Sequence, residues 1–127
     1  MAVRYAIYKE LRLVISTASD SVSFADIKSH QDQLSNDPDF DPQFNQFIDT
    51  TAVTVLDIST QEAIVVAQRK IFSRTSRRAF VAPTPAVFGL GRLMEAYNEM
   101  SDAKSQVCVF YDTHSALKWL GLESLPQ

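Results

Sequence analysis

The stretch from Ala82 to Tyr97, APTPAVFGLGRLMEAY, carries two glycines and an arginine after a predicted strand. A dinucleotide-binding loop of the form G-x-G-x-x-G lets the backbone approach a pyrophosphate at the start of a helix. Here Gly89 and Gly91 fall inside the predicted helix, and Met94 stands where the third glycine would be. We therefore expect both glycines to serve close packing of this helix rather than phosphate binding.

The start of the same helix is the tentative ligand-binding region of the sequence. Thr84 and the free amides of the first helical turn can hold an anion, as the N-terminus of a helix generally can. We take Thr84, Phe88 and Arg92 as tentative ligand-binding residues. The ligand would be a small apolar or anionic, lipid-like molecule between the sheet and this helix.

This helix also has more apolar surface than one narrow stripe requires. One predicted face consists of Val87, Leu90, Met94 and Tyr97, and Phe88 and Leu93 fall beside it. A wide apolar face usually packs on a sheet, and its excess can also line a pocket or a contact between two copies. We favour core plus interface, and we expect a homodimer.

Residue types that support nucleophilic or metal chemistry are sparse. His30 and His114 are the only histidines, they lie far apart in the chain, and neither H-E-x-x-H nor G-x-S-x-G occurs. Cys108 is the only cysteine, which rules out a disulfide or a thiolate metal cage within one chain. We expect two surface histidines, no catalytic residues, no metal, no cofactor and no enzymatic activity.

Two aspartates follow apolar runs that read as strands. Asp49 and Asp112 would lie near the C-terminal ends of these strands, where mostly parallel sheets commonly bind ligands. A receiver domain uses that edge, but it also needs an acidic pair and a lysine, and Tyr111 and Asp112 stand where the lysine should be. We therefore expect Asp112 to cap the last helix.

A basic run follows the second predicted helix. Five of the ten residues from Arg69 to Arg78 are Lys or Arg. Cations at the C-terminal end of a helix favour its negative pole, so a solvated helix end explains the run. A docking patch for an acidic partner or for anionic lipid headgroups is the alternative.

The elements that would position these residues alternate between strands and helices. Two short β-prone runs around the turn at Lys9-Glu10 predict a hairpin, and a helix follows over 24–36 with Ser23 as its cap. A strand then begins at Phe44, a helix runs to about Arg74 after a capping box at Ser59, and three further elements follow. They are a strand over 79–82, a helix over 85–100 and a strand over 107–111, before the helix capped by Asp112. This order predicts a mostly parallel sheet of about five strands with about four helices.

The composition sets the broad class. The 127 residues are enough for one domain, and 46% hydrophobic residues supply one core. A net charge of −3 offers no global attraction for nucleic acid, and no window approaches the roughly 18 apolar residues of a membrane span. The start of the chain carries charge at once and shows no apolar signal region. We expect a single cytoplasmic domain over 1–127, without nucleic-acid binding or stable membrane insertion.

Several of these segments together resemble a known family. The segments are DPDFDPQFNQFIDTT, the capped helix, AFVAP, VFGLGRLMEAY and VCVFYDTHSALKWLGL. Together they resemble the SpoIIAA-like proteins, relatives of the STAS and CRAL-TRIO domains, from about Val22 to Leu120. The most specific part is the strand that leads through Asp112 to an A-x-x-W-L helix at Ala116. The resemblance implies a small α/β domain.

The same resemblance implies two classes of function. STAS relatives act as protein-binding regulators, and some are switched by phosphorylation of a serine before the second helix. Ser59 and Thr60 are the tentative phosphorylation sites here, although the region has no glycine and carries Glu62. CRAL-TRIO relatives bind apolar ligands such as lipids. We expect a non-enzymatic regulatory or protein-interaction module that meets a partner through its second and third helices, and a binder of a small apolar or anionic ligand as the alternative.

Overall fold

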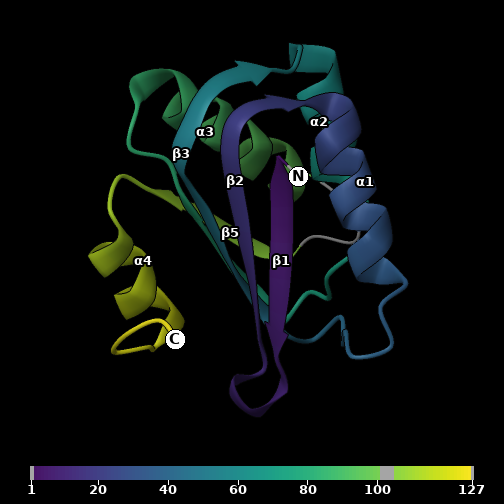
Figure 1. Ribbon diagram of the computed structural model, residues 1–127, viewed down its shortest axis with the longest axis vertical. Helices are drawn as coiled ribbons and strands as arrows, with labels where there is room; N and C mark the ends of the chain where they lie inside the picture. The colour runs from purple at the N-terminus through teal and green to yellow at the C-terminus, as the bar shows by residue number, and fades with distance from the viewer. Residues whose placement is uncertain (1, 101–104, 127) are drawn as a thin grey trace.

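The computed structural model describes residues 2–100 and 105–126 as a five-stranded sheet with four α-helices (Figure 1). The strands are β1 (Val3–Tyr8), β2 (Leu13–Ser23), β3 (Asn45–Asp57), β4 (Arg77–Val81) and β5 (Gln106–Phe110). The helices are α1 (Phe24–Ser35), α2 (Thr60–Gln68), α3 (Pro85–Glu99) and α4 (Thr113–Leu120), with a short 3-10 turn, η1, at Lys9–Leu11. This is the α/β class and the element order that the sequence predicts.

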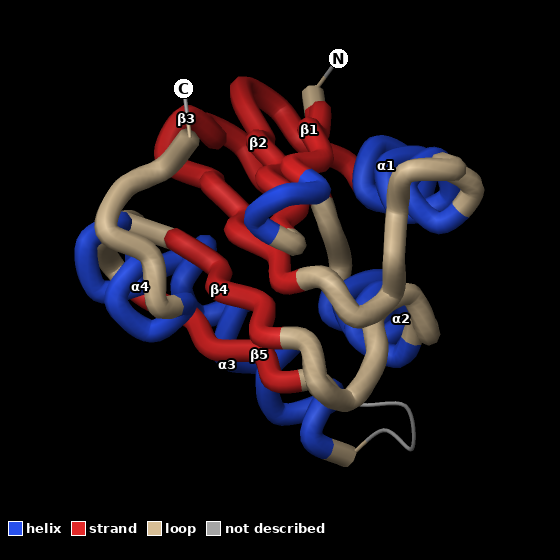
Figure 2. Tube along the Cα trace, turned by 90° about the horizontal axis from the view of Figure 1, so that it is seen from below, coloured by secondary structure: helices blue, strands red, loops and turns tan. Residues whose placement is uncertain are grey.

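The strands stand side by side in chain order, β1-β2-β3-β4-β5. Only β1 and β2 are antiparallel, and each later neighbour pairs in parallel, as the sequence predicts. Because parallel crossovers are right-handed, three successive crossovers in one direction place α1, α2 and α3 on the same face. The helix α4 follows the last strand and lies on the opposite face, as Figures 1 and 2 show.

The opening hairpin is confirmed, but its turn is longer than two residues. The connection consists of η1 and Arg12, which has the left-handed φ of 52°. Lys-Glu is poor chemistry for a tight two-residue turn, and the chain spans the gap with a 3-10 turn instead. The strand β2 also continues to Ser23, so it is longer than the short β-prone run that the sequence predicts after the turn.

The helix caps lie where the sequence places them. The Ser23 side chain accepts from the Asp26 amide, and the Ser59 side chain accepts from the Glu62 amide, each within a capping box. Asp112 accepts from the amide of Ser115 and so caps α4. Each cap satisfies amides that the first turn leaves without a partner.

The predicted extension of the second helix to about Arg74 is wrong, because α2 ends at Gln68. Arg69 adopts an extended backbone, and its guanidinium forms an ion pair with Asp32 and donates to the side chain of Gln31. Phe72 then turns into a buried cluster with Leu34 of α1. Anchoring of Arg69 and Phe72 against α1 therefore stops the helix before the basic run.

Gly91 and Gly89 have different surroundings, although both were expected to serve packing. A Cβ on Gly91 would lie 2.8 Å from a methyl carbon of Val109 in β5, so this glycine does permit close packing of α3 on the sheet. A Cβ on Gly89 would meet nothing within 4 Å, so the packing role predicted for Gly89 is wrong.

Candidate functional site

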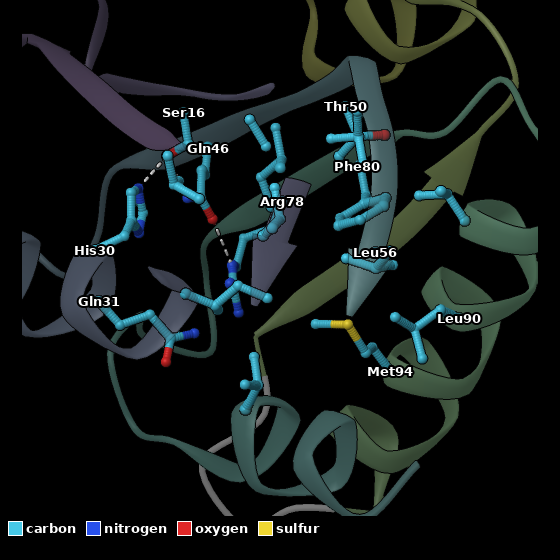
Figure 3. Close-up of a pocket in the computed structure, with 18 of the residues that line it drawn as sticks. Ser16, His30, Gln31, Gln46, Thr50, Leu56, Arg78, Phe80, Leu90 and Met94 are labelled. Atoms are coloured by element: carbon cyan, nitrogen blue, oxygen red, sulfur yellow. Dashed lines mark hydrogen bonds between the residues drawn. The ribbon is translucent and has the colours of Figure 1, made fainter. Parts of the chain in front are cut away.

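A cavity of about 90 Å³ lies between the sheet and helices α1, α2 and α3 (Figure 3). Its wall is mostly apolar, and its apolar members come from β1–β4 and from all three helices. They include Val3, Ala18, Val22, Ile27, Ile48, Val53, Leu56, Val66, Phe80, Val87, Leu90 and Met94. Concave, mostly apolar sites with a few convergent polar groups are the usual form of small-molecule pockets.

A chain of four polar side chains crosses one wall of this cavity. Arg78 Nε donates to Gln46 Oε1 over 2.9 Å, and Gln46 Nε2 donates to Ser16 Oγ over 2.9 Å. Ser16 Oγ lies 2.8 Å from His30 Nε2, and Figure 3 shows the four side chains in a row along the wall. The chain therefore connects β4, β3, β2 and α1 through side chains that face the same cavity.

The hydrogen atoms of this row of hydrogen-bonded side chains can be assigned consistently. Because Ser16 Oγ accepts from Gln46 and is buried, its own hydroxyl hydrogen needs an acceptor, and the Nε2 lone pair of His30 is that acceptor when Nδ1 carries the ring proton. Burial, with a smaller contribution from the charge on Arg78, lowers the pKa of His30 to about 4. The imidazole is therefore neutral at pH 7, as its role as an acceptor requires.

Arg78 places a positive charge in this cavity without a carboxylate partner. Burial lowers the pKa of Arg78 to about 10, so its guanidinium remains charged at pH 7. Among the described residues, none of the ion pairs includes Arg78. Its guanidinium carbon lies 4.6 Å from the ring centroid of Phe72, which is a cation–π contact. Arg78 is partly buried, and a partly desolvated cation without a counter-ion among the described residues is costly, a cost that an anion in the cavity would offset.

Ser16 and His30 are a nucleophile and a base at hydrogen-bonding distance, but their surroundings do not activate the serine. An imidazole with a pKa of about 4 is a weak general base at pH 7. Ser16 is 1% exposed and accepts from Gln46 in the middle of the sheet. The pair therefore acts as part of a structural hydrogen-bond chain that holds Gln46 and, through it, Arg78.

A second, smaller space continues from the cavity towards β5. Its volume is about 20 Å³, and Ile48, Val66, Arg78, Phe80 and Met94 line both spaces. The thioether of Met94 has three rotatable bonds and adapts readily to a neighbouring group. Rotation of this side chain would lengthen the cavity towards Asn98 and Val107.

The tentative ligand-binding residues of α3 do not line the cavity. Thr84 caps α3 by accepting from the amide of Val87, and Arg92 pairs with Glu95 at 3.7 Å on the exposed side. The ring of Phe88 stacks on Tyr111 with centroids 3.8 Å apart. The cavity instead meets the face of α3 that carries Val87, Leu90 and Met94, as the predicted apolar face indicates. A ligand at Thr84, Phe88 and Arg92 stays a prediction.

The tentative phosphorylation sites lie at the start of α2. Ser59 and Thr60 are exposed, and the Ser59 hydroxyl oxygen is occupied by the capping bond from the amide of Glu62. Phosphorylation at either residue stays a prediction.

The predictions for His30 and for the basic run are corrected by the packing. His30 is 6% exposed, so it is not a surface histidine, whereas His114 is exposed. The residues from Arg69 to Arg78 do not form a solvated helix end, because Arg69 pairs with α1 and Arg78 enters the cavity. Arg77 turns to the opposite face, where it donates to the carbonyl of Trp119 and lies over its ring.

Sequence reasoning missed Ser16, Gln46 and Arg78 as members of one site. The available signal was a polar residue at an inward position of a β-prone run, which is unusual in a core. The strand register places Gln46 opposite Arg78. On the other side, Gln46 pairs with Val14, and Ser16 is the next residue of β2 on the same face. That register depends on contacts across the sheet, which the sequence pattern of a single strand does not contain.

Within residues 2–100 and 105–126, no group of three or more His, Cys, Asp or Glu side chains gathers as a metal site would require. None of the described helices has the length and apolar character needed to cross a membrane.

Comparison with known proteins establishes the fold. One solved structure that matches is an uncharacterized protein of the DUF3478 family with a SpoIIAA-like fold, from Shewanella loihica PV-4. The TM-score is 0.61 at 15% sequence identity, and the match covers 94% of each chain. No family model and no curated protein matches the sequence. The chain therefore has a SpoIIAA-like fold, as its resemblance to that family implies.

Proposed function

We propose that this protein is a non-enzymatic binding module that holds a small, largely apolar ligand in the cavity between the sheet and helices α1–α3. The observation that carries the proposal is Arg78, a charged side chain on the wall of an apolar cavity without a carboxylate partner among the described residues. A charged side chain without a partner in the interior lowers the stability of a protein, and ligand binding is a reason to retain it.

A regulatory role fits the position of the cavity. The walls of the cavity include residues of α1, α2 and α3, so a bound ligand would stabilise the arrangement of the same helices that present the outer surface. A ligand shifts a conformational equilibrium only by its differential affinity for the two states. A protein partner that contacts α2 and α3 would then bind differently to the empty and the filled forms.

The test is thermal melting with small probes. We expect 1-octanol or octanoate to raise the melting temperature, because a ligand that binds only the folded state stabilises it by mass action. Leu90→Trp would fill the cavity from α3 and remove this shift, whereas Ala96→Trp, on the exposed side of α3, would retain it. Absence of any shift in the wild type at millimolar probe would contradict the proposal.

Self-association is a second candidate function, favoured by one surface feature. Tyr111 is 56% exposed and stacks on Phe88, so an aromatic pair lies at the surface between α3 and the end of β5. Aromatic residues are enriched in protein interfaces. Sedimentation velocity should show a dimer at micromolar concentrations that Tyr111→Ser weakens, and a monomer throughout would exclude this candidate.

A further inference from the structure

Two side chains at one end of the cavity, Arg78 and Gln31, offer hydrogen-bond donors to an anion. Arg69 donates to Oε1 of Gln31 over 3.1 Å, and this bond fixes which end of the Gln31 amide faces away from the cavity. Figure 3 shows the amide nitrogen of Gln31 turned inward, on the same side of the cavity as Arg78. The terminal nitrogens of Arg78 and the amide nitrogen of Gln31 are donors, so this end of the cavity favours an acceptor group.

Resting on the function proposed above, we propose that the ligand is an unbranched monocarboxylate, with its carboxylate on Arg78 and its hydrocarbon chain directed towards Met94.

The count of charges favours a single negative charge on the ligand. Among the described residues, Arg78 is the one cation that lines the cavity, since His30 is neutral at pH 7 and Arg69 is paired with Asp32. A monoanion would neutralise Arg78, whereas a phosphate dianion would leave an excess negative charge in an apolar space. Such an uncompensated charge is strongly disfavoured.

The free edge of the guanidinium favours a planar group. Gln46 occupies Nε, and the ring of Phe72 covers one face of the group. Among the described residues, none accepts a hydrogen bond from the two terminal nitrogens, and this edge of the guanidinium matches the two oxygens of a carboxylate in a bidentate pair. A lysine would supply the same charge without that geometry.

The remainder of the cavity favours a hydrocarbon chain. Ile48, Phe80 and Met94 line both the main cavity and the smaller space beyond it, so an apolar chain can follow one continuous wall. Each buried methylene contributes about 0.8 kcal/mol of transfer free energy. Affinity should therefore rise with chain length until the smaller space is filled, and then stop rising.

The experiment is calorimetric titration of the wild type with octanoate, 1-octanol and octyl phosphate. We expect octanoate to bind at least tenfold more tightly than either of the others. Arg78→Met should weaken octanoate binding by tenfold or more and leave 1-octanol unchanged. Arg77→Gln is the matched control, because the neighbouring arginine faces the other side of the sheet and its loss should leave both affinities unchanged.

Each other outcome has a defined meaning. Equal affinity for octanoate and 1-octanol, unaffected by Arg78→Met, would overturn the carboxylate assignment while the proposed cavity binding stands. Tighter binding of octyl phosphate than of octanoate would also overturn the carboxylate. Failure of all three probes to bind the wild type would overturn the proposed function itself. If Arg78→Met does not fold, Arg78→Lys replaces it, and octanoate affinity equal to that of the wild type would overturn the bidentate pairing.

Discussion

The two faces of the sheet are packed in different ways. On the face under α4, the buried side chains are apolar and form one closed cluster, which includes Leu13, Phe47, Val81, Leu117 and Leu120. On the other face, three helices enclose a cavity and a chain of polar side chains. The face under α4 is therefore closely packed, whereas the face under α1–α3 combines buried clusters with the space and the charge on which the proposed ligand binding rests.

The neighbouring residues Arg77 and Arg78 show this division within one strand. Successive side chains of a strand point to opposite faces, so these two arginines meet different surroundings. Arg77 rests on Trp119 and donates to its carbonyl, whereas Arg78 faces the cavity. Identical residue types one position apart therefore have a packing role on one face and a proposed binding role on the other.

The largest effect is expected from Phe47, at the centre of the closed face. Phe47 is 0% exposed, and Phe47→Ala should lower the free energy of unfolding by about 3–5 kcal/mol. Phe80→Ala removes the same atoms from the wall of an existing cavity, so its cost should be clearly smaller. Urea denaturation of both variants measures the difference, and equal losses would contradict the difference in packing between the faces.

The next effect is a dependence of stability on pH that originates in His30. The folded-state pKa of about 4 lies below the ordinary value of 6.5, so the unfolded state binds a proton first as the pH falls. Stability should therefore be full above pH 7 and decrease by about 3 kcal/mol between pH 6.5 and pH 4. His30→Gln keeps an acceptor for Ser16 and should flatten this window, whereas His114→Gln, on the surface, should not.

Denaturant titrations at closely spaced pH values would follow this window. The carboxylates with lowered pKa values, those of Asp26, Asp32, Asp37 and Asp112, lose their contribution only when the pH falls towards and below their ordinary values near 4. A wild-type stability that stays constant from pH 6.5 to pH 5 would show that His30 is not held neutral.

The two glycines of α3 give a smaller, paired effect of opposite sign. Gly91→Ala should lower stability by about 1–3 kcal/mol, because its Cβ would press on Val109. Gly89→Ala should raise stability by up to about 1 kcal/mol, because alanine is the better helix former and nothing obstructs it. Thermal melting of the two variants is sufficient, and a loss at both positions would contradict the open surroundings of Gly89.

The smallest effect on stability is expected from the residue proposed to bind the ligand. Arg78→Met removes a partly buried cation that has no carboxylate partner among the described residues and keeps an apolar side chain in its place, so the ligand-free protein should change by less than about 1 kcal/mol or gain stability. A loss of several kcal/mol, as for Phe47→Ala, would show that Arg78 has a structural role, which would weaken the comparison between the faces.

The sequence predicts the elements well where local chemistry decides them. Ser23, Ser59 and Asp112 mark helix starts because a short polar side chain accepts from a nearby amide, and this requires only neighbours in the chain. The α/β class follows from the alternation of strands and helices. The predicted end of the second helix was wrong because Arg69 and Phe72 are held by α1, which is distant in sequence.

The site was less accessible to sequence reasoning than the fold. His30 lies in a polar helical stretch, and its burial follows from packing against Tyr5 and Ser16 on two different strands. Arg78 belongs to a basic run in which its neighbours are exposed or paired elsewhere. Only the three-dimensional arrangement shows that one of these five cations faces an apolar cavity.

The most direct test of ligand binding in the cavity is a titration observed at the methionine methyl groups. Met94 lines both the cavity and the space beyond it, whereas Met100 is 78% exposed, so protein labelled with ¹³C at the methionine methyls contains its own control. Added octanoate should shift the methyl resonance of Met94 in a saturable manner and leave that of Met100 in place. An unchanged Met94 resonance at millimolar octanoate, or equal shifts at both methyls, would contradict the account.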